Sequence, residues 1–96
     1  MRIRWTQPAV QDLTRICDYI LERNGPEAAR RAAVRVCEGI NGLTHFPFRG
    51  RTGRTPETRE LVFPGLPYLA IYRVGAGAIE VLRILHGAQQ WPPAGN

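Results

Sequence analysis

The stretch that decides the fold runs from Thr58 to Pro92 and reads TRELVFPGLPYLAIYRVGAGAIEVLRILHGAQQWP. It contains three apolar runs rich in β-branched and aromatic residues, and two turn signals made of glycine, proline and alanine separate them. The runs are Thr58 to Phe63, Tyr68 to Val74 and Ala78 to His86, and the turns are Pro64-Gly-Leu-Pro67 and Gly75-Ala-Gly77. This pattern predicts three consecutive antiparallel strands, an antiparallel meander.

The segment before the meander predicts one strand and two helices. Arg2 to Trp5 alternates, and Thr6 after it is a candidate helix cap. Asn24-Gly25 stops the first helix, and Pro26 suits the first position of the second. The apolar stripes are Ala9, Leu13, Ile16, Cys17 and Ile20 in one helix and Ala29, Ala33, Val36, Ile40 and Leu43 in the other, whereas Asp12, Arg15, Glu22 and Arg23 point elsewhere.

Two amphipathic helices joined by a very short turn should form an antiparallel hairpin that packs on the sheet. The predicted fold class is therefore α+β: a strand, a two-helix antiparallel hairpin, and then a three-stranded antiparallel meander. The length of 96 residues suits one domain, residues 1–96, with residues 87–96 as a C-terminal tail. No internal repeat or linker interrupts it.

The last predicted strand is apolar on both faces, which predicts a central position in the sheet. Simple alternation places Ile79, Val81, Arg83 and Leu85 on one face and Glu80, Leu82, Ile84 and His86 on the other. Because the helix hairpin can cover only one face, we expect the other face, which bears apolar residues and an arginine, to stay partly open unless another segment covers it. Function is expected on that open face.

The charge predicts an acidic partner. All thirteen basic residues are arginine, and the formal net charge is +5. Cys17 and Cys37 are expected to be buried, reduced thiols on the helices. No long apolar run or cleavable leader is evident, so we expect a soluble, cytoplasmic protein that does not enter a membrane.

Candidate functional residues are mostly arginines. His45 and His86 lack ligand partners at metal spacing, so no metal site and no cofactor are expected. The loop from His45 to Glu57 carries arginines, the strands carry more, and these are the predicted partner-binding residues: Arg49, Arg51, Arg54, Arg59 and Arg83. A purely structural interpretation makes Arg59 a charge partner of Glu60. Arg83 is different, because an arginine among apolar neighbours needs a partner or access to water. The helix residues Arg30, Arg31 and Arg35 are interpreted as a solvated face.

The Arg-Glu-Leu, Pro-Tyr and Leu-Arg-Ile-Leu-His sequences of the meander, together with the segment from Trp5 to Leu43, resemble the RelE/ParE family of bacterial toxins. The likeness covers about the whole chain. RelE-like members cut messenger RNA in the ribosome, and ParE-like members poison DNA gyrase. The chain departs from the RelE-type pattern because it has no lysine, Leu69 follows Tyr68, and Trp91 stands where a late tyrosine might be.

The resemblance therefore implies a ParE-like toxin without catalytic residues, which poisons gyrase and is neutralised by a ParD-like antitoxin. It also implies that operator DNA is bound only through the antitoxin. An alternative is a metal-independent, RelE-like messenger RNA endonuclease that uses Arg59, Arg83 and His86. A second alternative is a nucleic-acid-binding module without toxicity, although the chain lacks a base-stacking strand motif.

Overall fold

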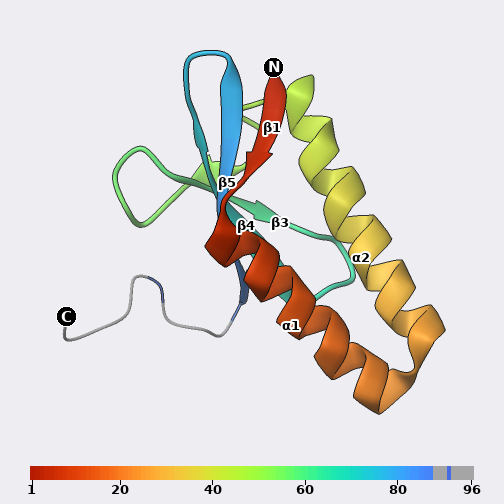
Figure 1. The fold of residues 1–96 in the computed structure, drawn as a ribbon. Coiled ribbons are helices and arrows are strands. Elements are labelled where there is room, and N and C mark those ends of the chain that lie inside the picture. The colour runs from red at the N-terminus through yellow and green to blue at the C-terminus, as the bar shows by residue number, and fades with distance from the viewer. Residues whose placement is uncertain (88–90, 92–96) are drawn as a thin grey trace.

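A computed structural model describes residues 1–87 and 91 and shows a five-stranded sheet with two helices on one side (Figure 1). The elements are β1 (Arg2–Trp5), α1 (Gln7–Asn24), α2 (Pro26–Asn41), the 3-10 turn η1 (Gly42–Thr44), β2 (Arg51–Thr52), β3 (Arg59–Val62), β4 (Tyr68–Val74) and β5 (Ala78–His86). Of the predicted tail, residues 87–96, all but Gly87 and Trp91 lie outside the described residues. The α+β class and the element order are as predicted.

The helix hairpin forms where the sequence signals place it. The Thr6 hydroxyl caps α1 by accepting from the backbone N–H of Ala9 at 3.4 Å, and it donates to the carbonyl of Val81 at 2.8 Å. Thr6 therefore also ties the start of α1 to β5. Gly25 joins the helices with a φ of 90°, a conformation that favours glycine, and Pro26 begins α2. In the described part of the chain, neither helix is long and apolar enough to cross a membrane.

The sheet has the strand order β1-β5-β4-β3-β2. The predicted meander, β3 to β5, is antiparallel throughout, and β1 adds to its edge in parallel with β5. β5 is an interior strand, but β4 rather than β5 occupies the centre. The two-residue strand β2 was not predicted, because it lies in the segment from His45 to Glu57, whose polar sequence shows no strand period.

A β-bulge changes the predicted faces of β5. Ile71 pairs with Arg83 and Tyr72 pairs with Val81, so Leu82 is an extra residue in the ladder. Ile84, rather than Arg83, therefore joins the core on the helix side. The simple alternation predicted for residues 79–86 was wrong beyond Val81, because one unpaired residue moves every later side chain to the opposite face.

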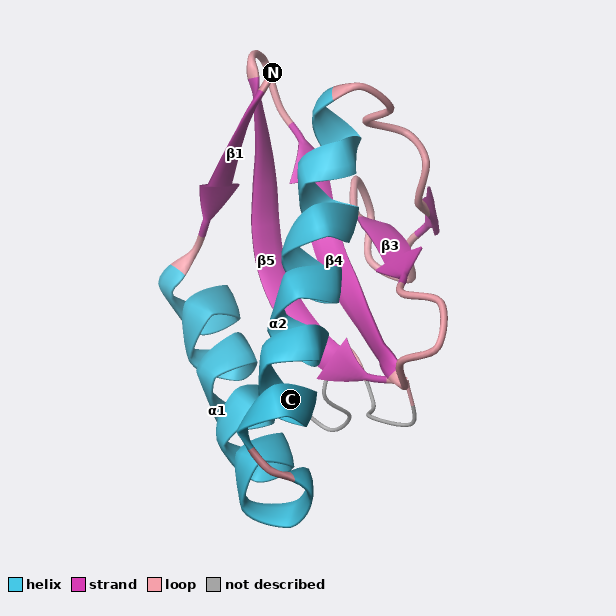
Figure 2. Ribbon diagram, turned by 90° about the vertical axis from the view of Figure 1, so that its right-hand side faces the viewer, coloured by secondary structure: helices cyan, strands magenta, loops and turns pink. Residues whose placement is uncertain are grey.

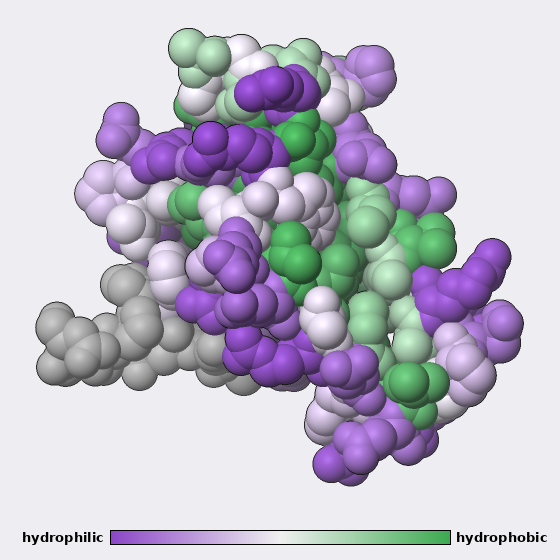
Figure 3. Space-filling model, viewed as in Figure 1, coloured by the Kyte–Doolittle hydropathy of each residue, from purple (hydrophilic) through white to green (hydrophobic). Residues whose placement is uncertain are grey.

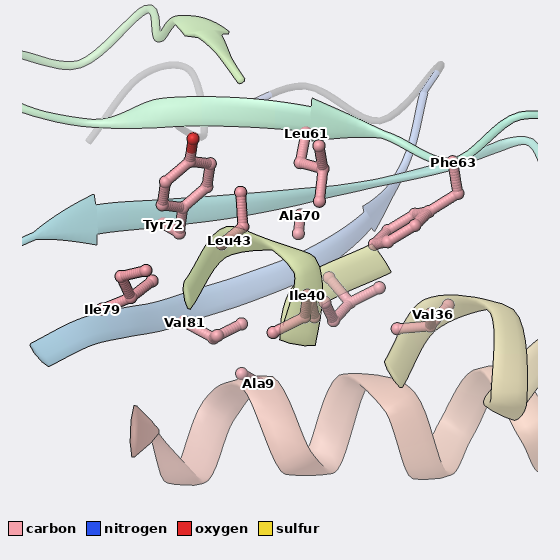
Figure 4. Packing of buried hydrophobic residues seen from close by; sticks show 11 residues of the cluster. Ala9, Val36, Ile40, Leu43, Leu61, Phe63, Ala70, Tyr72, Ile79 and Val81 are labelled. Atoms are coloured by element: carbon pink, nitrogen blue, oxygen red, sulfur yellow. The ribbon is translucent and has the colours of Figure 1, made fainter. Parts of the chain in front are cut away.

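The main core lies between the helix hairpin and the sheet (Figures 2 and 4). Val36, Ile40 and Leu43 are almost completely buried. They pack against Leu61, Phe63, Ala70, Tyr72, Ile79, Val81 and Ile84 of the sheet and against Ala9 of α1. α2 approaches β3 closely at Gly39, where an added Cβ would lie 2.8 Å from the Phe63 ring. Burial of each large aliphatic side chain contributes about 1.5–3 kcal/mol, so this layer holds the hairpin on the sheet.

The second face of the sheet is not the open apolar face that the sequence predicted. Leu69, Ile71 and Leu85 are buried there, and Leu82 and Trp91 pack against them. The remainder of this face is polar: Glu80 of β5 forms ion pairs with Arg4 of β1 and Arg73 of β4. The prediction was wrong for these apolar residues because Trp91 packs against them. Trp91 lies beyond the last strand, so the alternation of residues within the strands could not predict this contact.

The cysteines differ in exposure. Both thiols are free, but Cys37 is exposed and only Cys17 is partly buried. Burial, followed by the nearby Asp18 and Cys37, raises the pKa of the Cys17 thiol. The predicted burial is met in part by Cys17, whereas that of Cys37 was wrong because its position lies beside, and not in, the apolar stripe of α2.

Candidate partner-binding surface

Two of the predicted partner-binding arginines are held by a carboxylate of the protein itself. Glu60 on β3 is 2% exposed, and its two carboxylate oxygens face Arg51 and Arg54. Arg51 donates through Nε at 3.2 Å and Nη2 at 3.0 Å to Oε1, and the backbone N–H of Arg54 donates to Oε2 at 3.3 Å. The register explains this arrangement, because β2 places Arg51 directly opposite Glu60.

The electrostatics of Glu60 show that the two arginines compensate for its burial. Burial alone would raise the pKa of this carboxyl, but the hydrogen bonds from Arg51 and Arg54, together with their charges, outweigh it and leave the pKa below its ordinary value. Glu60 is therefore ionised at neutral pH. Its role is structural: it fixes the loop after β2 on the sheet.

Arg59 is not paired with Glu60, although the two are neighbours in sequence. Its Nη1 donates to the carbonyl of Gly50 at 2.8 Å and to that of Phe48 at 3.3 Å. Its guanidinium carbon also lies 4.8 Å from the centre of the Phe48 ring. The interpretation of Arg59 as a charge partner of Glu60 was wrong: Arg51 of β2 and Arg54 after it bind that carboxylate, whereas Arg59 binds backbone carbonyls.

Arg83 has the partner that an arginine among apolar residues needs. Its Nε and Nη2 donate to the two carboxylate oxygens of Asp12 at 2.6 and 2.9 Å. The backbone N–H of Ile84 also donates to Asp12, at 3.0 Å. β1 ends its pairing with β5 at Val81, so this carboxylate occupies the free edge of β5 beyond that point. Asp12 was expected to point away from the core, but it is 6% exposed.

The electrostatics of Arg83 confirm a fixed ion pair. The hydrogen bonds to Asp12 raise the pKa of the guanidinium, although partial burial acts in the opposite direction. The Arg83 guanidinium also lies 5.7 Å from the centre of the Trp91 ring. Arg83 therefore joins α1, β5 and Trp91.

The structure brings together two of the three residues named for a nuclease. Arg83, His86 and Tyr68 line a small pocket of about 170 Å³ beside Asp12. The rings of Tyr68 and His86 meet edge to face, with centroids 5.7 Å apart. Arg59 is elsewhere: it pairs with Tyr72, whereas His86 pairs with Tyr68, about 13 Å away along β4 at ~3.3 Å per residue.

The remaining predicted residue, Arg49, belongs to a different surface, which we call the α2 groove. This groove runs between α2 and the β3–β4 connection. Arg31 and Arg35 of α2 line it together with Arg49. All three side chains are exposed, and none of them has a carboxylate partner among the described residues.

The floor of the α2 groove is mainly apolar. One part, of about 360 Å³, lies at the end of the helix hairpin, and a second, of about 320 Å³, lies between α2 and β3. The apolar lining residues are Tyr19, Ile20, Ala28, Ala32, Leu61, Val62, Phe63, Pro64, Leu66, Pro67 and Tyr68. Arg35 belongs to both parts and lies over Gly65, where an added Cβ would be 3.0 Å from its Nη1. In Figure 3, apolar patches over the helix hairpin are bordered by hydrophilic residues.

Arg31 and Arg35 were interpreted as part of a solvated face, although the sequence carried a signal for the α2 groove. Arg31 and Arg35 are four residues apart, and so are Ala28 and Ala32, so the basic and the small residues form two adjacent rows on α2. Small residues flanked by arginines suit close approach of an acidic segment. The sequence could not predict, however, that the β3–β4 connection forms the opposite side of the groove, because only the folded structure places it beside α2.

Comparison with known proteins decides the family. Residues 3–91 match the model of the family described as the ParE toxin of the type II toxin–antitoxin system parDE. The chain belongs to the ParE toxin family. This ParE-family protein is 42% identical over 91 residues to the protein Y4kP of Sinorhizobium fredii, an alignment that covers 95% of this chain and 93% of Y4kP. It is 40% identical to the toxin RelE2 of Caulobacter vibrioides, with 92% and 97% covered.

Two solved structures show the same fold. The chromosomal ParDE toxin–antitoxin system of P. aeruginosa contains a chain that superimposes with a TM-score of 0.84 at 32% identity, covering 90% of this toxin and 95% of that chain. The RelBE2 toxin–antitoxin complex of Mycobacterium tuberculosis gives a TM-score of 0.63 at 24% identity, with 88% and 95% covered. The second likeness concerns the fold alone.

Proposed function

We propose that this ParE-family toxin arrests growth by binding and poisoning DNA gyrase, and that a cognate ParD-like antitoxin neutralises it by direct binding in the cytoplasm. The observation that carries this proposal is the division of the arginines. Arg51, Arg54 and Arg83 are engaged by the protein's own carboxylates, whereas Arg31, Arg35 and Arg49 are exposed beside an apolar groove. Such a surface suits recognition of a protein segment more than cleavage of a phosphodiester.

The α2 groove is the proposed antitoxin site. An amphipathic segment can place its apolar side chains on Ala28, Ala32 and Leu66 while its carboxylates meet Arg31 and Arg35. Opposite charges of this kind direct the encounter and fix the register of the bound segment. Operator DNA would then be bound only through the DNA-binding part of the antitoxin. The likeness to a chain of a ParDE system supports this arrangement.

The nuclease alternative retains one supporting observation, the pocket shared by Tyr68, Arg83 and His86. Two features weigh against it. The Arg83 guanidinium already donates to Asp12 through Nε and Nη2, and burial raises the pKa of the Tyr68 hydroxyl, so less of its basic phenolate form is present at neutral pH. Arg59 is distant from the pocket, and Arg15, which also lines it, lies 3.9 Å from the same Asp12 carboxylate that holds Arg83.

The deciding experiment compares the two targets directly. Purified toxin is added to a gyrase supercoiling assay and, separately, to ribosomes translating a defined message, each with and without equimolar antitoxin. We expect loss of supercoiling and gyrase-dependent DNA breaks, both reversed by antitoxin, and intact message. Cleaved message with normal supercoiling would favour the nuclease. Salt-dependent shift of bare DNA or RNA by the toxin alone would favour a nucleic-acid-binding module.

A further inference from the structure

Two aromatic side chains are displayed on the surface next to the α2 groove. Phe46 is 66% exposed and Phe48 is 64% exposed, the largest exposures among the large hydrophobic residues described. They flank Pro47 in the connection between η1 and β2, a segment that we call the aromatic loop, residues 45–50. Residues His45 to Arg49 line an open hollow of about 560 Å³. Exposure of two phenyl rings to water is unfavourable, so their presence requires an explanation.

The aromatic loop is anchored from below by one buried side chain. Tyr72 is fully buried on β4, and its hydroxyl donates to the carbonyl of Pro47 at 2.7 Å. The same hydroxyl accepts from the backbone N–H of Gly50 at 2.9 Å. Gly50 must be glycine in this conformation, because an added Cβ would lie 2.7 Å from the Tyr72 ring and 2.8 Å from the carbonyl oxygen of Glu60.

A second set of contacts fixes the outer part of the aromatic loop. Arg59 donates to the carbonyls of Phe48 and Gly50, and its guanidinium stacks on the Phe48 ring. Within the loop, the backbone N–H of Arg49 donates to the carbonyl of Phe46 at 3.1 Å, and that of Phe46 donates to the carbonyl of Gly42 at 3.2 Å. The two rings are therefore carried on a backbone with few free torsions. A preorganised aromatic pair loses little conformational entropy when it binds.

We propose that Phe46 and Phe48 are the anchor by which the toxin binds its folded protein target, and that they insert into an apolar pocket with carboxylates at its rim. This inference rests on the proposed function and names the contact surface for it. Buried aromatic side chains dominate the binding energy of protein interfaces, and Arg49 and Arg59 supply the adjacent positive charge. A folded protein is the favoured occupant, because two rings that protrude from the surface fit a pocket, whereas a linear segment fits a groove.

The position of the aromatic loop also accounts for neutralisation. Arg49 lines both the loop and the α2 groove, so the two surfaces meet at this residue. An antitoxin segment seated in the α2 groove lies beside the aromatic rings without needing to bind them. The antitoxin then blocks the target by occupying the space that the larger protein requires.

The test uses the double variant Phe46→Ala/Phe48→Ala and the control Val10→Ala, which removes an exposed apolar side chain on α1. Three properties are measured for each: thermal unfolding of the free toxin, calorimetric affinity for the full antitoxin, and growth arrest on induction without antitoxin. We expect the double variant to unfold within a few degrees of the wild type and to bind antitoxin within about twofold. Growth arrest should be lost, and in a supercoiling assay, added as a fourth measurement, gyrase inhibition should weaken at least about thirtyfold, which corresponds to ~2 kcal/mol.

Each outcome has one meaning. Loss of growth arrest with intact folding and antitoxin affinity supports the aromatic loop as target anchor, and normal behaviour of Val10→Ala confirms that the loss is specific. Full growth arrest by the double variant would overturn the inference, and so would a parallel loss of antitoxin binding, which assigns the loop to the antitoxin. Wild-type toxin that leaves gyrase active would refute the proposed function. It would not decide the present inference, which the growth-arrest comparison between the variants tests for any target.

Discussion

Replacement of Asp12 by alanine should destabilise the toxin more than any single change on its surface. Asp12 is 6% exposed and accepts three hydrogen bonds, two from the Arg83 guanidinium and one from the backbone N–H of Ile84. Asp12→Ala therefore leaves one partly buried guanidinium without its charge partner and one buried backbone donor at the edge of β5 without an acceptor. It also removes one of the ties between α1 and β5, while the bond from Thr6 to Val81 remains.

The magnitude follows from these groups. A buried donor without an acceptor costs about 1–3 kcal/mol, and more when it is charged. Removing one partner of a fully buried ion pair costs about 3–5 kcal/mol of stability. The cost here is smaller, because the Arg83 side chain is 27% exposed and water can replace part of its hydrogen bonding to Asp12. We expect Asp12→Ala to lower the free energy of unfolding by about 3 kcal/mol. For a domain of this size the total is about 5–14 kcal/mol, so the effect is large.

Urea unfolding of the free toxin measures this change, with Arg83→Ala and the double variant as controls. Arg83→Ala should cost about 2 kcal/mol, and the double variant should cost about as much as Asp12→Ala alone, because the two side chains form one interaction. Strictly additive effects, or an Asp12→Ala protein within ~0.5 kcal/mol of the wild type, would refute the reasoning. Because Asp12 holds Arg83, any loss of toxicity in Arg83→Ala should be accompanied by this loss of stability.

Two further predictions concern the loop that carries β2. Because the folded state holds the pKa of Glu60 below its ordinary value of 4.5, its ion pairs stabilise the protein above about pH 4.5 and lose that contribution as the pH falls through the folded-state pKa. Urea unfolding between pH 3 and 7 should therefore show a shallower acid loss for Glu60→Gln than for the wild type, and identical slopes would contradict this role. Gly50→Ala should lower the free energy of unfolding by about 1–3 kcal/mol, measured by thermal unfolding, because its Cβ would collide with Tyr72 and with backbone. Gly75→Ala is the control and should cost less, because its Cβ would lie 3.5 Å from the nearest atom. Equal costs would contradict the close approach at Gly50.

Much of the fold could be predicted because the local signals agree with one another. The bounds of β4 and β5, the cap at Thr6 and the start of α2 at Pro26 all follow from residue types at fixed positions. What failed depends on contacts between distant residues. The bulge at Leu82 is set by the pairing of β4 with β5, and the burial of Asp12 depends on α1 lying at the edge of β5 beyond the end of β1.

The candidate surface was less predictable than the fold for a related reason. The arginines look equivalent in the sequence, but in the fold some of them form ion pairs with the protein's own carboxylates and the others do not. β2 places Arg51 opposite Glu60, and the edge of β5 brings Asp12 to Arg83, whereas Arg35 receives no such partner among the described residues. Sequence reasoning can count guanidinium groups, but their availability is a property of the folded arrangement.

The measurement that tests the central claim most directly is the affinity of the cognate antitoxin for variants of the two arginine classes. Calorimetry compares Arg31→Ala and Arg35→Ala, in the α2 groove, with Arg51→Ala, whose side chain is engaged by Glu60. We predict that each groove variant weakens binding by about tenfold, or ~1.4 kcal/mol, and that Arg51→Ala binds as the wild type does. Normal affinity of both groove variants with weakened binding by Arg51→Ala would contradict the account.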